Sequence, residues 1–209
     1  MEICGSSSRV RATFTKRKVG GSSPTLPLHI FECSIKEIQS FIEQWHYSKS
    51  CFGVTCSVAF RVNQGTELVG AAIFGLPAGT GVYKKYSDQN RLSLLELRRF
   101  CLIDRLPKNS ESFCIGVMLR ELRRRGVQRI LSYADPAYQH TGHIYKACGF
   151  TLMGKTAKRR HFVWNGKRYP DRNVHQVHFP YHKELRAAIA NGEVERIEVI
   201  GKFIYVKDL

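Results

Sequence analysis

The feature that most constrains the fold of this chain is a strand followed at once by an acidic turn and a short helix. Residues 129–134 form a largely apolar run, Asp135-Pro136 ends it, and a short helical segment closes at Gly149-Phe150. Such connections are typical of open α/β sheets, which place their chemistry at the carboxyl ends of strands. Strands and helices alternate along the chain around one antiparallel hairpin. We therefore expect an α/β fold, a mixed β-sheet flanked by helices.

Periodicity and turn residues locate the individual elements. Strands are expected over 28–33, 55–61, 67–74, 93–103, 127–134, 150–153, 161–164 and 174–179, and helices over 35–45, 112–125 and 182–191. A capping box from Ser34 to Glu37 opens the first helix. Residues 75–90 are expected to form a loop after the hairpin, and 193–206 a terminal hairpin around Gly201.

The segments group into an arm and a domain. Residues 1–26 are rich in Ser, Gly and Thr, and predict a flexible basic arm or a first strand. Residues 27–209 are expected to form one catalytic domain, with 151–209 as its basic C-terminal extension.

Charge is the strongest global signal. The chain carries 33 Lys and Arg against 17 Asp and Glu, a net charge of +16. Such a field attracts polyanions, and nucleic acid is favoured over an anionic membrane surface because no long basic amphipathic helix is present. No stretch approaches the roughly 20 apolar residues of a membrane helix. Seven cysteines without a Cys-x-x-Cys pair indicate free thiols in a reducing, cytoplasmic setting.

The Asp135-Pro136-Ala137-Tyr138 turn suits an exocyclic amine such as that of adenine. The Asp135 carboxylate would accept a hydrogen bond from the amine, and Tyr138 would offer a face for stacking. The alternative is purely structural, with Asp135 as a helix cap and Pro136 at the first helical position.

The segment 155–172 is the expected nucleic-acid surface. Basic residues there would neutralise phosphates, and aromatic faces would stack on bases. The candidates are Lys155, Lys158, Arg159, Arg160, Lys167 and Arg168, with Trp164 and, outside the segment, Tyr138. The alternative is a solvated basic hairpin with Phe162 and Trp164 in the core.

Two histidine clusters are weaker candidates for a metal site. His140 and His143 have the spacing of one helical face, with Asp135 nearby, which is the residue set of a non-haem iron site. His175, His178 and His182 form the other cluster, but Pro180 breaks any single helix through it. For both clusters, surface or base-stacking histidines are the favoured interpretation.

Several motifs together resemble a known family. They are His46-Tyr47-Ser48, Phe74-Gly75-Leu76-Pro77, Leu95-Glu96-Leu97-Arg98-Arg99-Phe100, Lys108-Asn109-Ser110, Ser132-Tyr133-Ala134-Asp135-Pro136 and Gly142-His143-Ile144-Tyr145. The element order resembles the GNAT acyltransferase fold, and the motifs resemble the Mom family of bacteriophage DNA-modification proteins. The resemblance implies a transferase that puts a carbamoylmethyl group on the exocyclic amine of adenine in double-stranded DNA. In the cytoplasm of the host cell this would protect phage DNA from restriction.

The resemblance also implies roles for particular residues. Asp135, Tyr145, His46 and Tyr47 become the catalytic candidates, with Tyr145 protonating a leaving group; packing before Gly149-Phe150 is its alternative role. The alternative role of His46 and Tyr47 is that of a polar pair that ends a helix. Arg98 and Arg99 are adjacent on a strand, so they face opposite sides and one of them would clamp the donor. Lys108, Asn109, Ser110 and Ser112 are the candidates for holding a donor phosphate at a helix N-terminus.

The acyl donor has two candidates. An acetyl-CoA-type donor follows from the resemblance, but residues 105–115 lack the glycines that let backbone amides approach a pyrophosphate. A glycyl ester such as glycyl-tRNA follows from the product, because a glycinamide needs a second nitrogen. Iron is a further candidate cofactor from the resemblance, and tRNA a further partner.

Three other functions compete with DNA modification. A methyltransferase would use the Asp-Pro-x-Tyr turn but needs a glycine-rich strand-turn-helix, which is missing. An N-acetyltransferase acting on a protein or small amine conflicts with the altered phosphate loop. A non-enzymatic DNA-binding module would leave the acid and tyrosine constellation without a role.

Overall fold

The computed structural model describes residues 9–14, 27–87, 93–175, 177 and 180–209. They divide into two compact units. Unit 1 comprises Met1–Tyr133, Gly142–Leu152 and Tyr205–Leu209, and unit 2 comprises Ala134–Thr141 and Met153–Ile204. Of the expected arm, 9–14 form a strand and the rest lies outside the described residues. The expected extension 151–209 thus falls largely into a unit of its own.

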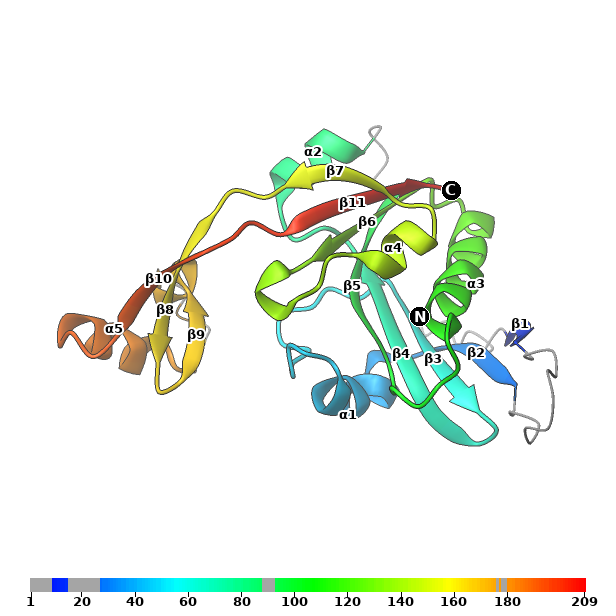
Figure 1. Ribbon diagram of the computed structural model, residues 1–209, viewed down its shortest axis with the longest axis horizontal. Coiled ribbons are helices and arrows are strands. Elements are labelled where there is room, and N and C mark those ends of the chain that lie inside the picture. Colours follow the sequence, from blue (N-terminus) through cyan, green and yellow to red (C-terminus); the bar gives the residue numbers. More distant parts are fainter. Residues whose placement is uncertain (1–8, 15–26, 88–92, 176, 178–179) are drawn as a thin grey trace, which may run out of the picture. The chain divides into compact units, whose positions relative to one another are not determined.

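An eight-stranded sheet forms the centre of the fold (Figure 1), in the order β1-β2-β3-β4-β5-β6-β11-β7. Its strands are β1 (Arg9–Phe14), β2 (Leu28–Cys33), β3 (Val58–Gln64), β4 (Glu67–Gly75), β5 (Leu94–Leu102), β6 (Arg129–Ala134), β7 (Thr151–Lys155) and β11 (Phe203–Asp208). The pairs from β1 to β5 are antiparallel, and β5 pairs with β6 in parallel. The predicted mixed sheet is therefore confirmed.

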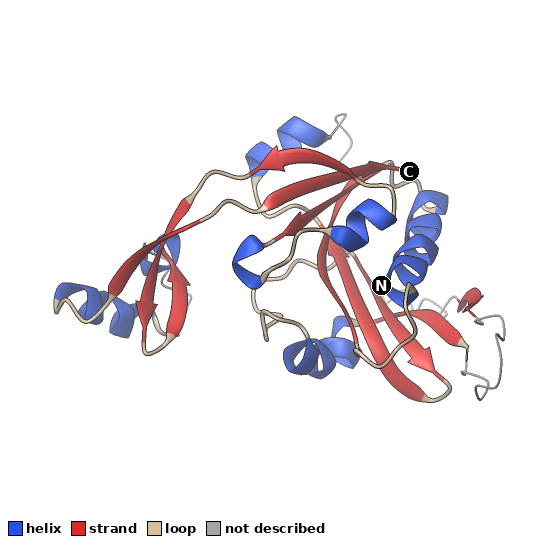
Figure 2. Ribbon diagram, in the orientation of Figure 1, coloured by secondary structure: helices blue, strands red, loops and turns tan. Residues whose placement is uncertain are grey.

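Four helices accompany this sheet among the described residues: α1 (Ile35–Trp45), α2 (Thr80–Tyr86), α3 (Ser110–Arg124) and α4 (His143–Ala147), seen in blue in Figure 2. The predicted capping box is present, since the Ser34 amide donates to the Glu37 carboxylate at 2.7 Å. The apolar face of α1 packs on β4 and β5 through Ile38, Phe41 and Ile42, and α3 packs against β1, β2 and α4.

Unit 2 has a small core of its own. It contains η1 (Pro136–Tyr138), β8 (Arg159–Trp164), β9 (Lys167–Pro170), η2 (Asp171–His175), α5 (His182–Ala190) and β10 (Glu195–Val199). The strands form an antiparallel sheet in the order β10-β8-β9. Phe162, Val174 and Leu185 are buried at its centre.

Three sequence expectations are wrong. Residues 80–86 of the expected loop form α2. Val174 and His175 belong to η2 instead of a strand, and 176, 178 and 179 lie outside the described residues. The terminal hairpin is also absent, because β10 and β11 belong to different sheets. Gly201 is not the turn of a hairpin. It lies where two backbone segments approach closely, so that a Cβ atom there would be only 1.8 Å from the Thr156 carbonyl oxygen.

None of the described helices is long and apolar enough to cross a membrane.

Candidate active site

The site in unit 1 begins where two parallel strands part. β5 and β6 pair only through Leu94–Arg129, Leu95–Ile130 and Glu96–Leu131, although both strands continue further. On one side of this branch point the two strands are paired, and on the other side their backbones separate. Glu96 and Ser132 occupy it, and both are buried.

Tyr145 lies in α4 between two aromatic rings. Its ring centroid is 5.5 Å from that of Phe150 and 5.4 Å from that of Tyr205. The helix approaches this closely because it starts at Gly142, which has φ of +81° and where a Cβ atom would lie 2.2 Å from the Tyr205 ring. Burial raises the pKa of the Tyr145 phenol to about 12, and the Ser132 hydroxyl opposes that shift. Both interpretations of Tyr145 are thus compatible, since a packed phenol that keeps its proton is also a proton donor.

Glu96 and the two adjacent arginines gather on β5. The register between β4 and β5 shifts, pairing Ile73 with Arg99 and Phe74 with Leu97, so Arg98 is an extra residue in the strand. An Nη1 atom of Arg98 lies 3.4 Å from Glu96 Oε2, with both side chains largely buried. The sequence reasoning did not select Glu96, although a carboxylate inside the run Leu94–Leu97 signals a buried charge that needs a partner.

Arg98 and Arg99 bind carbonyl groups of different segments. Arg98 Nη1 donates to the Leu76 carbonyl at 3.3 Å, and Arg99 Nε donates to the Ser50 carbonyl at 3.0 Å. Burial lowers the pKa of Arg99, and Tyr47 opposes that shift. Arg98 therefore ties the segment after β4 to β5, and Arg99 ties the segment after α1 to β5.

His46 and Tyr47 end α1 beside this cluster. The Ser48 amide donates to Nδ1 of the buried His46 ring at 3.1 Å, and the Ser48 hydroxyl oxygen lies 2.8 Å from the same nitrogen. The rings of His46 and Tyr47 lie 4.3 Å apart. Tyr47 acts electrostatically on both Tyr145 and Arg99, so it belongs to the same cluster. We call Tyr47, Glu96, Arg98, Arg99, Ser132 and Tyr145 the site cluster.

The expected phosphate loop precedes α3, but its hydroxyls bind their own backbone. Ser110 Oγ donates to the Pro107 carbonyl at 2.6 Å, and Ser112 Oγ donates to the Asn109 carbonyl at 3.1 Å. Asn109 takes a left-handed conformation to make this turn, and Lys108 is exposed. In the structure both serine hydroxyls are hydrogen-bonded within the turn, while donor binding there stays a prediction.

In unit 2, Asp135 has partners at both carboxylate oxygens. Oδ1 accepts a hydrogen bond from the Ala137 amide at 3.1 Å, so the predicted cap exists, and Oδ2 pairs with Lys202 Nζ at 2.9 Å. Lys202 is itself placed by Thr156, whose hydroxyl accepts from its amide at 2.9 Å. Burial lowers the pKa of the nearby His161, and Asp135 opposes that shift. Lys202 and His161 are partners of Asp135 that the sequence did not reveal.

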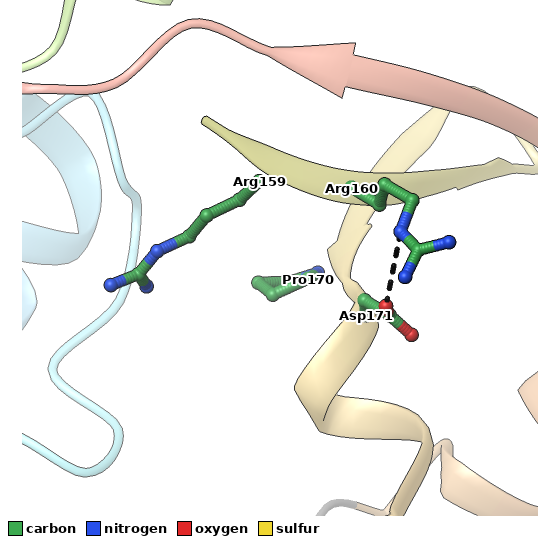
Figure 3. A pocket seen from close by; sticks show the side chains of 4 residues that line it. All are labelled: Arg159, Arg160, Pro170 and Asp171. Atoms are coloured by element: carbon green, nitrogen blue, oxygen red, sulfur yellow. Dashed lines mark ion pairs between the residues drawn. The ribbon is translucent and has the colours of Figure 1, made fainter. Parts of the chain in front are cut away.

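The predicted nucleic-acid residues in unit 2 divide between the two faces of the small sheet. The register of β8 with β9 puts Arg159 and Arg168 on the face of His161, and Arg160 and Lys167 on the opposite face. Figure 3 shows Arg159 and Arg160 pointing apart on either side of a depression lined also by Pro170 and Asp171, with Arg160 paired to Asp171 at 3.9 Å.

Three other candidates of this surface have identified neighbours. Lys158 pairs with Glu198 at 2.9 Å, and Lys155 Nζ lies 4.7 Å from the centre of the Phe203 ring. Trp164 packs against Tyr169 and the core of unit 2, which favours the packing role that was its alternative. Tyr138 is exposed, as a stacking residue would be.

The predicted metal clusters receive no support from the geometry. Within the described part of the chain, no group of three His, Cys, Asp or Glu side chains could hold an ion. His178 lies outside the described residues. The described residues therefore do not fit a bound iron.

The Mom protein family matches residues 27–209. Methylcarbamoylase mom of Escherichia phage Mu is 30% identical over 140 residues, which are 65% of this chain and 56% of that protein. The chain thus matches little more than half the length of this relative.

The solved structures give the fold. An acetyltransferase of the GNAT family from Streptococcus pneumoniae superposes with a TM-score of 0.52 at 10% identity, covering 87% of this chain and 99% of that one. The IAA acetyltransferase from Bacillus cereus covers the same shares at 10% identity, with a TM-score of 0.49. The GNAT fold expected from the sequence is confirmed.

Proposed function

Because this chain belongs to the Mom protein family, we propose that it is a transferase that installs a carbamoylmethyl group on the exocyclic amine of adenine in DNA. The name of its phage Mu relative, methylcarbamoylase, supports transfer of such a group. The net charge of +16 supports a polyanionic substrate. The observation that carries the proposal is the site cluster, where a protonated phenol and a buried carboxylate lie at the branch point of β5 and β6.

Acyl transfer to an amine requires a proton acceptor and a proton donor. The adenine nitrogen attacks the carbonyl carbon of the donor, the new C–N bond forms, and the bond to the leaving group breaks. In this proposal the buried carboxylate of Glu96 takes the amine proton, and Tyr145 gives its proton to the leaving group. Within unit 2, Asp135 remains a candidate for accepting a hydrogen bond from an exocyclic amine, and Lys202 fixes its carboxylate. His46 and Tyr47 form a wall beside the acceptor.

A glycyl ester, such as glycyl-tRNA, accounts for the second nitrogen of the product. Adenine first displaces the tRNA hydroxyl and forms a glycyl amide. The free glycyl amine then attacks the purine carbon through a five-membered ring, and the original nitrogen leaves that carbon as the terminal amide. The two steps rearrange the atoms of the amide without any oxidant. An acetyl-CoA-type donor is the alternative, and the capped hydroxyls of Ser110 and Ser112 weigh against it.

Mass spectrometry of nucleosides from plasmid DNA tests the function. Cells that express the protein should yield carbamoylmethyl-deoxyadenosine, and cells that express Glu96→Gln should yield much less. Unmodified plasmid from cells containing folded wild-type protein would contradict the proposal and favour an acetyltransferase acting on another amine.

Labelling distinguishes the donors. Because purine synthesis itself uses glycine, growth on glycine labelled with ¹³C and ¹⁵N should give a modified base that carries more of both labels than unmodified deoxyadenosine from the same DNA if a glycyl ester is used. A modified base with no more label than unmodified deoxyadenosine would exclude the glycyl route.

A further inference from the structure

Exposed aromatic side chains concentrate in one short segment of unit 1, residues 45–54, which we call the aromatic loop. Trp45, Tyr47 and Phe52 are 46%, 38% and 58% exposed. Exposed aromatic surface of this kind marks an interaction site when it is held in a defined position.

The turn that carries Phe52 is held firmly. Cys51, just before it, is buried, and its carbonyl accepts a hydrogen bond from the Val54 amide at 3.2 Å. The Phe52 amide donates to Ser50 Oγ at 3.0 Å. Gly53 follows with φ of +66°, which a residue with a side chain rarely adopts. Phe52 therefore lies on an anchored turn, with more than half of its surface exposed.

The same turn is tied to the site cluster. Arg99 Nε on β5 donates to the Ser50 carbonyl, and Tyr47 of the aromatic loop acts electrostatically on Tyr145. Phe52 thus stands two residues from a carbonyl bound directly by the site. On a base-modifying enzyme an exposed aromatic side chain has a specific use, because an adenine must leave the stack before its amine can be reached.

We infer that Phe52 inserts into the DNA duplex and fills the space left by the extruded adenine. This inference rests on the proposed function in taking duplex DNA as the partner. Apolar wedges between base steps are an established way to stabilise an opened stack. The net charge of +16 suits the phosphates of such a partner.

Two readouts test the inference with Phe52→Ala, the conservative variant Phe52→Trp and the control Leu152→Ala, which truncates another exposed apolar side chain of unit 1. The first uses one plasmid fragment, as duplex or heat-denatured, in extract from cells that support modification. Phe52→Ala should modify the duplex at least tenfold less than wild type but the single strands equally well. Phe52→Trp and Leu152→Ala should behave as wild type.

The second readout needs no donor. A duplex with 2-aminopurine at its adenine positions should fluoresce more when wild-type protein binds, and Phe52→Ala should bind it without that increase. If wild type opens this duplex but modifies no DNA, the proposed function fails and the inference stands. Equal fluorescence with wild type and Phe52→Ala, or equal loss of activity on duplex and single strands, would overturn the inference.

Discussion

At the scale of single residues, side chains of the site cluster can both stabilise the fold and take part in proton transfer. Tyr145 fills space between Phe150 and Tyr205, and the burial that results keeps its phenol protonated. Removing only the hydroxyl separates the two roles, since the ring remains in place.

Tyr145→Phe should reduce adenine modification about a hundredfold to ten-thousandfold, the usual contribution of a positioned acid. Its free energy of unfolding at neutral pH should change by no more than about 1 kcal/mol. Nucleoside mass spectrometry and denaturant unfolding measure the two quantities. Wild-type modification by this variant would remove Tyr145 from the mechanism.

The raised pKa of Tyr145 also predicts an alkaline stability effect. Because the phenol ionises near pH 10 in the unfolded chain and near 12 in the folded protein, the unfolded state loses its proton first. Wild type should therefore lose stability, relative to Tyr145→Phe, as the pH rises from about 10 to 12. Unfolding of both proteins at pH 9 and pH 11 gives the comparison. An unchanged difference between them would show that the phenol is not buried as described.

Lys202 should matter through Asp135. Lys202→Met leaves a buried carboxylate without its cation, and should lower the free energy of unfolding by about 1–3 kcal/mol. It should also raise the pKa of His161, because Lys202 lowers it and Asp135 raises it. Imidazole NMR shifts as a function of pH report this change. Asp135→Asn is the matched control, and should lower the same pKa.

At the scale of elements, close backbone approaches set the geometry. Gly201→Ala should destabilise the protein severely, because its Cβ atom would meet the Thr156 carbonyl and no flexible side chain can move aside. Gly116→Ala, inside α3 with the nearest atom at 3.7 Å, should instead stabilise by about 0.5–1 kcal/mol. Thermal unfolding of both variants tests this contrast. A tolerated Gly201→Ala would mean that the two segments do not run so close.

The elements also explain which expectations succeeded. Local patterns located α1 and β5, because a capping box and an apolar run report directly on the chain that contains them. They failed for β10, which pairs with β8 across more than 30 residues, and for the role of Gly201, which is defined by a distant carbonyl. The pairing of Asp135 with Lys202 was equally hidden, since no spacing rule connects positions so far apart.

At the scale of the whole molecule, charge governs association. Each phosphate contact contributes about 0.9 to the slope of the logarithm of DNA affinity against the logarithm of salt concentration. Exchanging both Arg159 and Arg168, on one face of the small sheet, for Ala should reduce that slope by roughly 2 if both contact phosphates. Lys158→Ala should reduce it less, because Lys158 is already paired with Glu198. Titrations at several salt concentrations measure the slope. If the double exchange and Lys158→Ala change the slope equally, the face with Arg159 and Arg168 is not the contact surface.

The sheet order has a further consequence. β7 and β11 are separated by almost fifty residues, yet both lie at one end of the large sheet as neighbours. The segment between them is, in its connectivity, a very long hairpin loop. The entropy cost of closing a loop grows only slowly with its length. The segment between β7 and β11 can therefore be replaced by another at little cost in stability. Relatives could therefore differ in this segment while the branch point of β5 and β6 is kept.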